Sequence, residues 1–119
     1  MWEVEALDEF RDWYRSLTEE QAVAVTQRVD QLDDVGPALD RPTVDHIEGS
    51  RHHNMKELRC SKDGALRVLF IFDPLRQAVL LLGGNKATEG WNDWYRWAIP
   101  RADDLYDGYL KDLEDEGLI

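Results

Sequence analysis

Residues 51–86 read RHHNMKELRCSKDGALRVLFIFDPLRQAVLLLGGNK, and this stretch decides how the chain folds. Three runs within it are rich in apolar residues and are separated by short turns that contain Gly, Asp or Pro, a pattern typical of antiparallel strands. The second run, LRVLFIFD, is apolar on both faces and is interrupted only by Arg67. We therefore expect it at the centre of a sheet. The three expected strands are 54–60, 66–73 and 78–84.

The same stretch is the basic part of an acidic chain. The sequence of 119 residues has 14 Lys and Arg against 25 Asp and Glu, which gives a net charge of −11, whereas residues 51–86 alone carry +4. Nonspecific nucleic-acid binding comes mainly from Lys and Arg that neutralise phosphates, so the overall charge weighs against a general nucleic-acid coat. Cations gathered in the apolar centre instead predict chemistry on a phosphate.

Two helices and two short strands are expected around this sheet on its N-terminal side. Residues 2–5 alternate apolar and acidic side chains, as a short edge strand does. Asp8 is expected to cap a first helix, and TEEQ at 18–21 has the form of a capping box that opens a second helix. Gly36-Pro37 predicts the end of that helix. A further edge strand is expected at 44–47.

The C-terminal part predicts helix. We expect a break before Pro100, because the residue before a proline avoids the helical region, and a last helix from Pro100 onward. The chain is thus expected to be a single α+β domain over residues 1–119, with an N-terminal helical hairpin packed on a small, mainly antiparallel sheet and a C-terminal helix. Aromatic side chains at the start of the C-terminal part could stack on RNA bases, although aromatic residues at helical spacing more often belong to the core. They are Trp91, Trp94, Tyr95 and Trp97.

Cysteine content and hydropathy bear on the compartment. Cys60 is the single cysteine, so no intramolecular disulfide is possible, and its place in an apolar strand predicts a buried side chain. The N-terminal residues lack a basic and then apolar leader, and no run approaches the ~20 apolar residues of a membrane span. We therefore expect a cytoplasmic protein with no membrane partner.

The segments NMKELR, LRVLFIFD and AVLLLGGNK, followed by an aromatic-rich helix, resemble the HigB-type toxins of the RelE/ParE superfamily of bacterial toxin–antitoxin modules, in their phage-related branch. The resemblance covers nearly the whole chain in element order. It implies a RelE-like fold, a cognate helix-turn-helix antitoxin as partner, and ribosome-bound mRNA as substrate. It also implies cleavage without metal or other cofactor, by attack of a ribose 2′-hydroxyl on the neighbouring phosphate.

The resemblance assigns roles to particular residues. Arg67 matches the strand arginine that contacts the scissile phosphate, and Arg59 matches the arginine that closes the preceding strand. Lys86 falls where the family has a basic or acid–base residue after the last strand, and Tyr95 loosely matches a helical tyrosine. Where several relatives carry a lysine in the first of these strands, this chain has Glu57, which leaves the identity of the base open.

Cleavage of RNA by its own 2′-hydroxyl needs a base, cations for the phosphorane and an acid for the 5′-oxygen. Strand alternation puts Glu57 and Arg59 on one face, so we expect Glu57 to be the base and Arg59 and Arg67 to clamp the phosphate bidentately. Lys86, whose pKa neighbouring cations would lower, is the expected acid. Around these four catalytic candidates we expect substrate-binding residues. They are Arg51, Lys56, Asn85 and Tyr95.

Plainer interpretations stay open for several of these residues. Arg67 could form only a structural ion pair with Glu57. Asp45 is an alternative base, and His52 or His53 could assist at the rim of the site. No Cys and His spacing fits a zinc site, so no metal is expected. Gly83-Gly84 is interpreted as a place of close backbone approach rather than a phosphate loop.

Two other functions also stay open. The first is a toxin of the ParE branch that poisons gyrase without cleaving RNA; the cations of the central stretch argue against it. The second is a catalytically inactive member that keeps the fold and binds an antitoxin. The net charge of −11 favours this second alternative, because a ribosome binder is expected to be basic.

Overall fold

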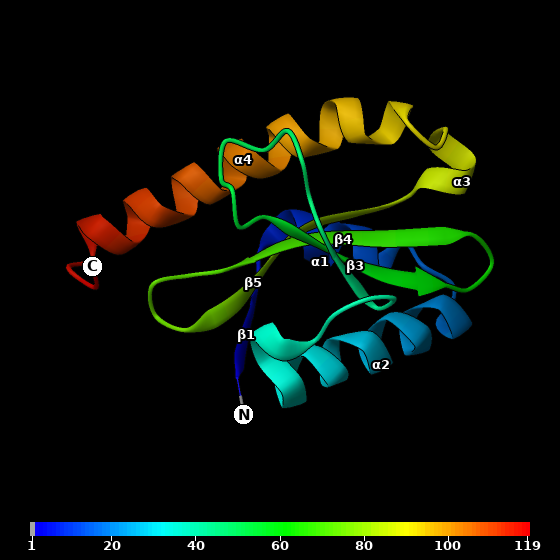
Figure 1. The fold of residues 1–119 in the computed structure, drawn as a ribbon, viewed down its shortest axis with the longest axis horizontal. Helices are drawn as coiled ribbons and strands as arrows, with labels where there is room; N and C mark the ends of the chain where they lie inside the picture. Colours follow the sequence, from blue (N-terminus) through cyan, green and yellow to red (C-terminus); the bar gives the residue numbers. More distant parts are fainter. Residues whose placement is uncertain (1) are drawn as a thin grey trace.

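The computed structural model describes residues 2–119 and places a five-stranded sheet between two layers of helices (Figure 1). The strands are β1 (Glu3–Ala6), β2 (Val44–His46), β3 (Lys56–Ser61), β4 (Ala65–Phe72) and β5 (Gln77–Asn85), and the helices are α1 (Asp8–Arg15), α2 (Glu19–Val35), the 3-10 helix η1 (Gly36–Ala38), α3 (Lys86–Glu89) and α4 (Asp93–Asp115). The strand order is β1-β5-β4-β3-β2, with β1 parallel to β5 and all other neighbours antiparallel. The expected α+β fold with a mainly antiparallel sheet is confirmed.

Strand β4 lies at the centre of the sheet, as predicted, and separates two hydrophobic cores. Its side chains alternate between the faces, so Val68 and Phe70 pack with α1 and α2 while Leu69 and Ile71 pack with α4. Arg67 has the parity of Leu69. Its side chain therefore points toward the α4 side, at a position where the rest of the strand is apolar.

The second helix begins and ends as its sequence predicts, whereas the predicted cap of the first helix is wrong. In α2 the hydroxyl of Thr18 accepts from the Gln21 N–H and the Gln21 side chain accepts from the Thr18 N–H, both at 3.1 Å. Gly36 ends the helix with a φ of 69°. Asp8 does not cap α1: Leu7 holds the cap position, and Asp8 lies in the first turn, where its carboxylate complements the helix dipole.

The predicted helix break before Pro100 is also wrong, because α4 runs unbroken from Asp93 to Asp115 (Figure 1). Pro100 removes one helical hydrogen bond, at a cost of about 3 kcal/mol. Its ring is exposed, however, while Ala98 and Ala102 on either side of it are fully buried in the core beneath α4. Packing of both halves on the sheet thus outweighs the local cost of the proline.

The two glycines at the end of β5 allow two tryptophans to approach the strand from opposite faces. A Cβ on Gly83 would lie 2.2 Å from the Trp13 ring, and a Cβ on Gly84 would lie 2.1 Å from Nε1 of Trp94. Neither position has room for a side chain. The close approach expected for Gly83-Gly84 is therefore confirmed. Lys86 lies two residues after Gly84.

Cys60 is buried and unpaired, as expected, and burial raises the pKa of its thiol. Its side chain packs in the core shared by the sheet, α1 and α2. In the part of the chain that the structure describes, no helix combines the length and the apolar character needed to cross a bilayer.

Candidate active site

Strands β3 and β4 place two arginines and a glutamate beneath the first turns of α4. Arg59 and Arg67 are direct cross-strand partners, an arrangement that is destabilising for like charges. Glu57 lies between them: its Oε1 is 2.9 Å from Nε of Arg59 and 3.4 Å from Nε of Arg67. The carboxylate is only 3% exposed, so it acts as a shared and buried counterion for both guanidiniums.

Helix α4 and the first residue of α3 complete the cluster from above. Tyr95 donates its hydroxyl to Oε2 of Glu57 at 2.7 Å, and Lys86 donates from Nζ to that hydroxyl oxygen at 3.1 Å. The Lys86 ammonium also lies 5.0 Å from the centre of the Tyr95 ring, within range of a cation–π contact. Hydrogen bonds thus join Lys86, Tyr95, Glu57 and Arg59, and an ion pair adds Arg67, so the four residues predicted to be catalytic lie together with Tyr95, which was predicted to bind substrate.

The surroundings shift the pKa values of three members of this network. Burial lowers the pKa of Lys86, and the nearby positive charge of Arg67 lowers it further. Burial, together with the hydrogen bond to Glu57, raises the pKa of Tyr95 to about 12. The hydrogen bond to Glu57 raises the pKa of Arg59. A phenol can donate a hydrogen bond only while it keeps its proton. Its raised pKa keeps Tyr95 protonated at neutral pH, so that it can donate to Glu57.

A second carboxylate reaches the cluster from the edge strand β2. Asp45 Oδ2 is 2.9 Å from Nη2 of Arg59, and its Oδ1 accepts from Nε of Arg41 at 2.9 Å. The hydrogen bond from Arg41 lowers the pKa of Asp45. Beside these groups opens a hollow of about 410 Å³, lined in part by Arg41, Asp45, Glu57, Arg59 and Tyr95. A planar guanidinium at the wall of an open hollow can hold phosphate oxygens bidentately.

Three of the four predicted substrate-binding residues, Arg51, Lys56 and Asn85, lie outside the Glu57 cluster. Lys56 precedes Glu57 in β3 and therefore points to the opposite face, where its Nζ lies 5.8 Å from the centre of the Phe72 ring. Asn85 caps α3, because its side-chain oxygen accepts from the N–H of Ala87 at 3.1 Å. The structure does not bring either side chain into the Glu57 cluster.

Arg51 and His52 belong to a separate set of contacts on α4. The guanidinium of Arg51 binds Asp104 at 3.0 Å and also Asp107, and His52 Nε2 lies 2.7 Å from Asp107. These contacts tie the loop before β3 to the middle of α4, away from Tyr95 in its first turns. His53 is exposed.

Sequence reasoning missed Arg41, which faces the hollow from the loop before β2. Arg41 reaches the cluster through the pairing of β2 with β3, in which Asp45 lies opposite Glu57. No local signal in the sequence indicates this contact.

Among the aromatic residues at the start of α4, Trp94 is fully buried in the core, whereas Trp91 and Trp97 are 59% and 45% exposed.

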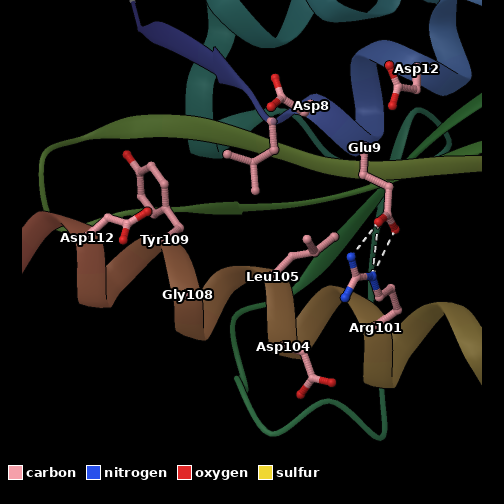
Figure 2. A pocket seen from close by; sticks show the side chains of 10 residues that line it. Asp8, Glu9, Asp12, Arg101, Asp104, Leu105, Gly108, Tyr109 and Asp112 are labelled. Carbon is pink, nitrogen blue, oxygen red and sulfur yellow. Dashed lines mark hydrogen bonds and ion pairs between the residues drawn. The ribbon is translucent and has the colours of Figure 1, made fainter.

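A different hollow, of about 480 Å³, lies between α1 and α4 (Figure 2). Its charged rim is almost entirely acidic, and Figure 2 shows its one cation, Arg101, directed at Glu9, to which it donates at 2.7 Å. A rim of this charge repels a phosphate. The Glu57 cluster is therefore the better candidate for phosphate chemistry. The acidic residues of the rim are Asp8, Glu9, Asp12, Asp104 and Asp112.

Metal-ligating residues do not cluster in the described part of the chain. Across residues 2–119, no three His, Cys, Asp or Glu side chains are arranged to hold a metal ion. Asp45 and Glu57, the carboxylates at the hollow, both bind arginines instead.

Comparison with known proteins identifies the relatives of this chain. Residues 12–107 match the family described as "Phage derived protein Gp49-like (DUF891)". The chain belongs to the Gp49-like family. A candidate toxin of Mycobacterium tuberculosis, HigB3, is 44% identical over 104 residues, which cover 87% of this Gp49-like chain and 90% of HigB3.

A second candidate toxin of the same organism, HigB2, is 44% identical over 105 residues. The match covers 87% of this Gp49-like chain but only 52% of HigB2, so the chain spans about half the length of that relative. A solved structure of an E. coli RelE mutant in the free state superposes with a TM-score of 0.61 at 9% identity, covering 84% of this chain and 96% of RelE. The shared fold and the named relatives confirm the resemblance found in the sequence.

Proposed function

We propose that this chain is the toxin of a type II toxin–antitoxin module and inhibits translation by cutting mRNA on the ribosome. The observation that carries the proposal is the cluster of Arg59, Arg67 and Lys86 around one buried carboxylate, Glu57, in an otherwise acidic chain. Membership of the Gp49-like family and the likeness to candidate HigB toxins support the toxin assignment. The cytoplasm, where ribosomes are, is the compartment that this function requires.

In the proposed reaction, Glu57 removes the proton of a ribose 2′-hydroxyl, and the freed oxygen attacks the adjacent phosphorus. Arg67 and Nη1 of Arg59, which neither Glu57 nor Asp45 binds, hold the two negatively charged oxygens of the phosphorane. Lys86 donates a proton to the departing 5′-oxygen, which leaves a 2′,3′-cyclic phosphate and a 5′-hydroxyl. A lowered pKa suits this role, because the acid must release its proton readily during each cycle.

The proposed partners are a cognate helix-turn-helix antitoxin and the ribosome with its mRNA. The antitoxin is supported by the family, since the named relatives are candidate toxins of the HigB type. The acidic surfaces of α1 and α4 are suited to a basic protein partner. The ribosome would supply the mRNA in a fixed conformation, so that a small site with few substrate contacts can still cut it.

The experiment is induction of this chain alone in bacteria, with growth and mRNA 5′ ends followed together. The test variant is Arg67→Ala Lys86→Ala, and the matched control is Arg15→Ala Lys111→Ala, which removes the same charge from positions that are 70% and 74% exposed. We expect the wild-type chain and the control to stop growth and to create new mRNA ends inside coding regions. The test variant should do neither, although it accumulates to the same level.

A second candidate function is an antitoxin-binding member that no longer cleaves RNA. The observation in its favour is that Glu57 already pairs with Nε of both arginines that would bind phosphate. Growth that continues after induction, with intact mRNA and a folded protein, would support this candidate. Growth arrest without new mRNA ends would point to another target, and a gyrase supercoiling assay would then test the ParE-like alternative.

A further inference from the structure

The edge strand β2 separates two hollows that meet at its outer side. In the register of β2 with β3, Asp45 lies opposite Glu57 and His46 lies opposite Lys56, so the two pairs point to opposite faces of the sheet. The hollow on the Glu57 side measures about 410 Å³ and the hollow on the Lys56 side about 640 Å³. Both are lined by Arg41, Asp45 and His46. They therefore adjoin around the edge of the sheet that β2 forms.

Arg41, His46 and Lys56 along this path keep groups that can bind a ligand. Within residues 2–119, Lys56 forms no ion pair with a carboxylate, and the His46 ring forms no side-chain hydrogen bond. Arg41 is 74% exposed and uses only Nε to bind Asp45, which leaves both terminal nitrogens available. Most other exposed cations are bound to carboxylates. These are Arg11, Arg15, Arg51, Arg96, Arg101 and Lys111.

We propose that this path is a subsite for single-stranded RNA, in which the nucleotides flanking the cleaved phosphate bend around the edge of β2. The inference rests on the proposed function, because it takes the Glu57 cluster as the position of the cleaved phosphate. Arg41 and Lys56 bind backbone phosphates, and His46 stacks on a base. The three residues of β2 make this edge only about 10 Å long, so a short segment of RNA spans it.

This assignment gives a role to Lys56, which cannot reach the cleaved phosphate from the opposite face of the sheet. It also gives a chain of net charge −11 a defined place at which to bind RNA. Asp40, Asp45 and Glu48 also line the two hollows, so we expect Arg41 and Lys56 to hold the strand at two phosphates rather than along a uniformly basic surface.

The test is a salt titration of RNA binding, because it counts phosphate contacts directly. The probe is a fluorescent single strand of eight nucleotides with 2′-O-methyl groups throughout, which this chemistry cannot cut. Each lost phosphate contact lowers the slope of log Kd against log salt by about 0.7. We expect Lys56→Ala to lower the slope by about 0.7 and Arg41→Ala Lys56→Ala by about 1.4. His46→Ala should weaken binding about tenfold without changing the slope.

The matched control is Lys62→Ala Lys111→Ala, which removes the same charge from exposed positions away from both hollows. It should keep the wild-type slope. A slope that falls equally in the control and in the test variant would overturn the proposal, and so would a wild-type chain that does not bind the probe. Circular dichroism checks that each variant melts at the same temperature as the wild-type chain before its salt slope is compared.

The outcomes separate this inference from the proposed function. If the wild-type chain binds the probe through Lys56 but leaves mRNA intact on the ribosome, the subsite stands and the cleavage proposal fails. If the chain cuts mRNA and Arg41→Ala Lys56→Ala leaves both the KM for cleavage and the salt slope unchanged, cleavage stands and the subsite is wrong.

Discussion

The hydroxyl of Tyr95 donates to both carboxylate oxygens of Glu57, at distances of 2.7 and 3.1 Å. This contact joins the first turns of α4 to strand β3, across 38 residues of sequence. It fixes the orientation of a carboxylate that also accepts from Arg59. The position of α4 and the geometry of the candidate site therefore depend on each other.

Loss of this hydroxyl should destabilise the protein in a pH-dependent way. We expect Tyr95→Phe to lower the free energy of unfolding at pH 8 by about 1.5–3 kcal/mol, the usual contribution of a hydrogen bond to a charged group. Tyrosine ionises near pH 10 in the unfolded chain, whereas the pKa of Tyr95 in the fold is raised to about 12. The contribution of its neutral form is therefore complete below pH 10 and lost as the pH rises to about 12.

Urea unfolding of the wild type and of Tyr95→Phe at several pH values checks this expectation. The difference in stability between the two proteins should narrow from pH 10 to pH 12. Tyr106, whose pKa burial also raises to about 12, lowers the stability of both proteins equally and cancels in the difference. A difference that stays constant across this range would contradict the role given to the neutral phenol.

Removal of the charge of Glu57 should expose the repulsion between the two arginines. Glu57→Gln is expected to cost about 3 kcal/mol, the lower end of the range for a broken buried ion pair, because Arg59 is still 34% exposed to water. The double variant Glu57→Gln Arg67→Met removes one of the opposing cations as well. It should lose less stability than the two single variants together, and a double-mutant cycle by denaturant unfolding measures the difference. Simple additivity would show that Glu57 does not couple to Arg67.

The proposed role of Lys86 predicts the pH dependence of cleavage. If Lys86 donates a proton, the single-turnover rate falls as the pH rises through its pKa, which burial and Arg67 place below the usual 10.5. Lys86→Arg keeps the positive charge but stays protonated over the whole range. The variant should cut more slowly and should lose this alkaline decline. The same decline in both proteins would assign it to another group.

The glycines of β5 offer a stability test with an internal control. Gly84→Ala should destabilise the protein by about 1–3 kcal/mol, because its Cβ would lie 2.1 Å from the buried Trp94 ring. Gly108 lies in α4 with nothing within 4 Å of its would-be Cβ. Gly108→Ala should therefore stabilise the protein by about 0.5–1 kcal/mol through helix propensity alone. Thermal unfolding of both variants tests the pair, and an unaltered melting temperature for Gly84→Ala would contradict the packing described above.

Elements with strong local patterns could be predicted from the sequence. The apolar run around Arg67 predicted the central strand, and the capping box at Thr18 predicted the start of α2. Strand alternation also placed Glu57 and Arg59 on one face. These predictions succeeded because the spacing of side chains along a strand or helix is fixed by backbone geometry.

Features that depend on packing between distant elements could not be predicted. Pro100 obeys a local rule for helix ends, but burial of the turns on either side of it decides the outcome. The cap of the short helix α3 is a local feature by contrast, but Asn85, which forms it, was predicted to bind substrate. Arg41 reaches the candidate site only through the register of β2 with β3. A sequence pattern gives the face on which a side chain lies but not the partner that it meets there.

The unequal protection of the strands has a consequence for the candidate site. Strand β4 has a neighbour on each side and a helix layer on each face, so its amide hydrogens exchange with solvent only when the whole sheet opens. Strand β2 has three residues and one neighbour, and its amides exchange through local opening. Arg67 is thus carried by the most protected strand and Asp45 by the least protected one. A local fluctuation can release Arg59 from Asp45 while Glu57 and Arg67 keep their places.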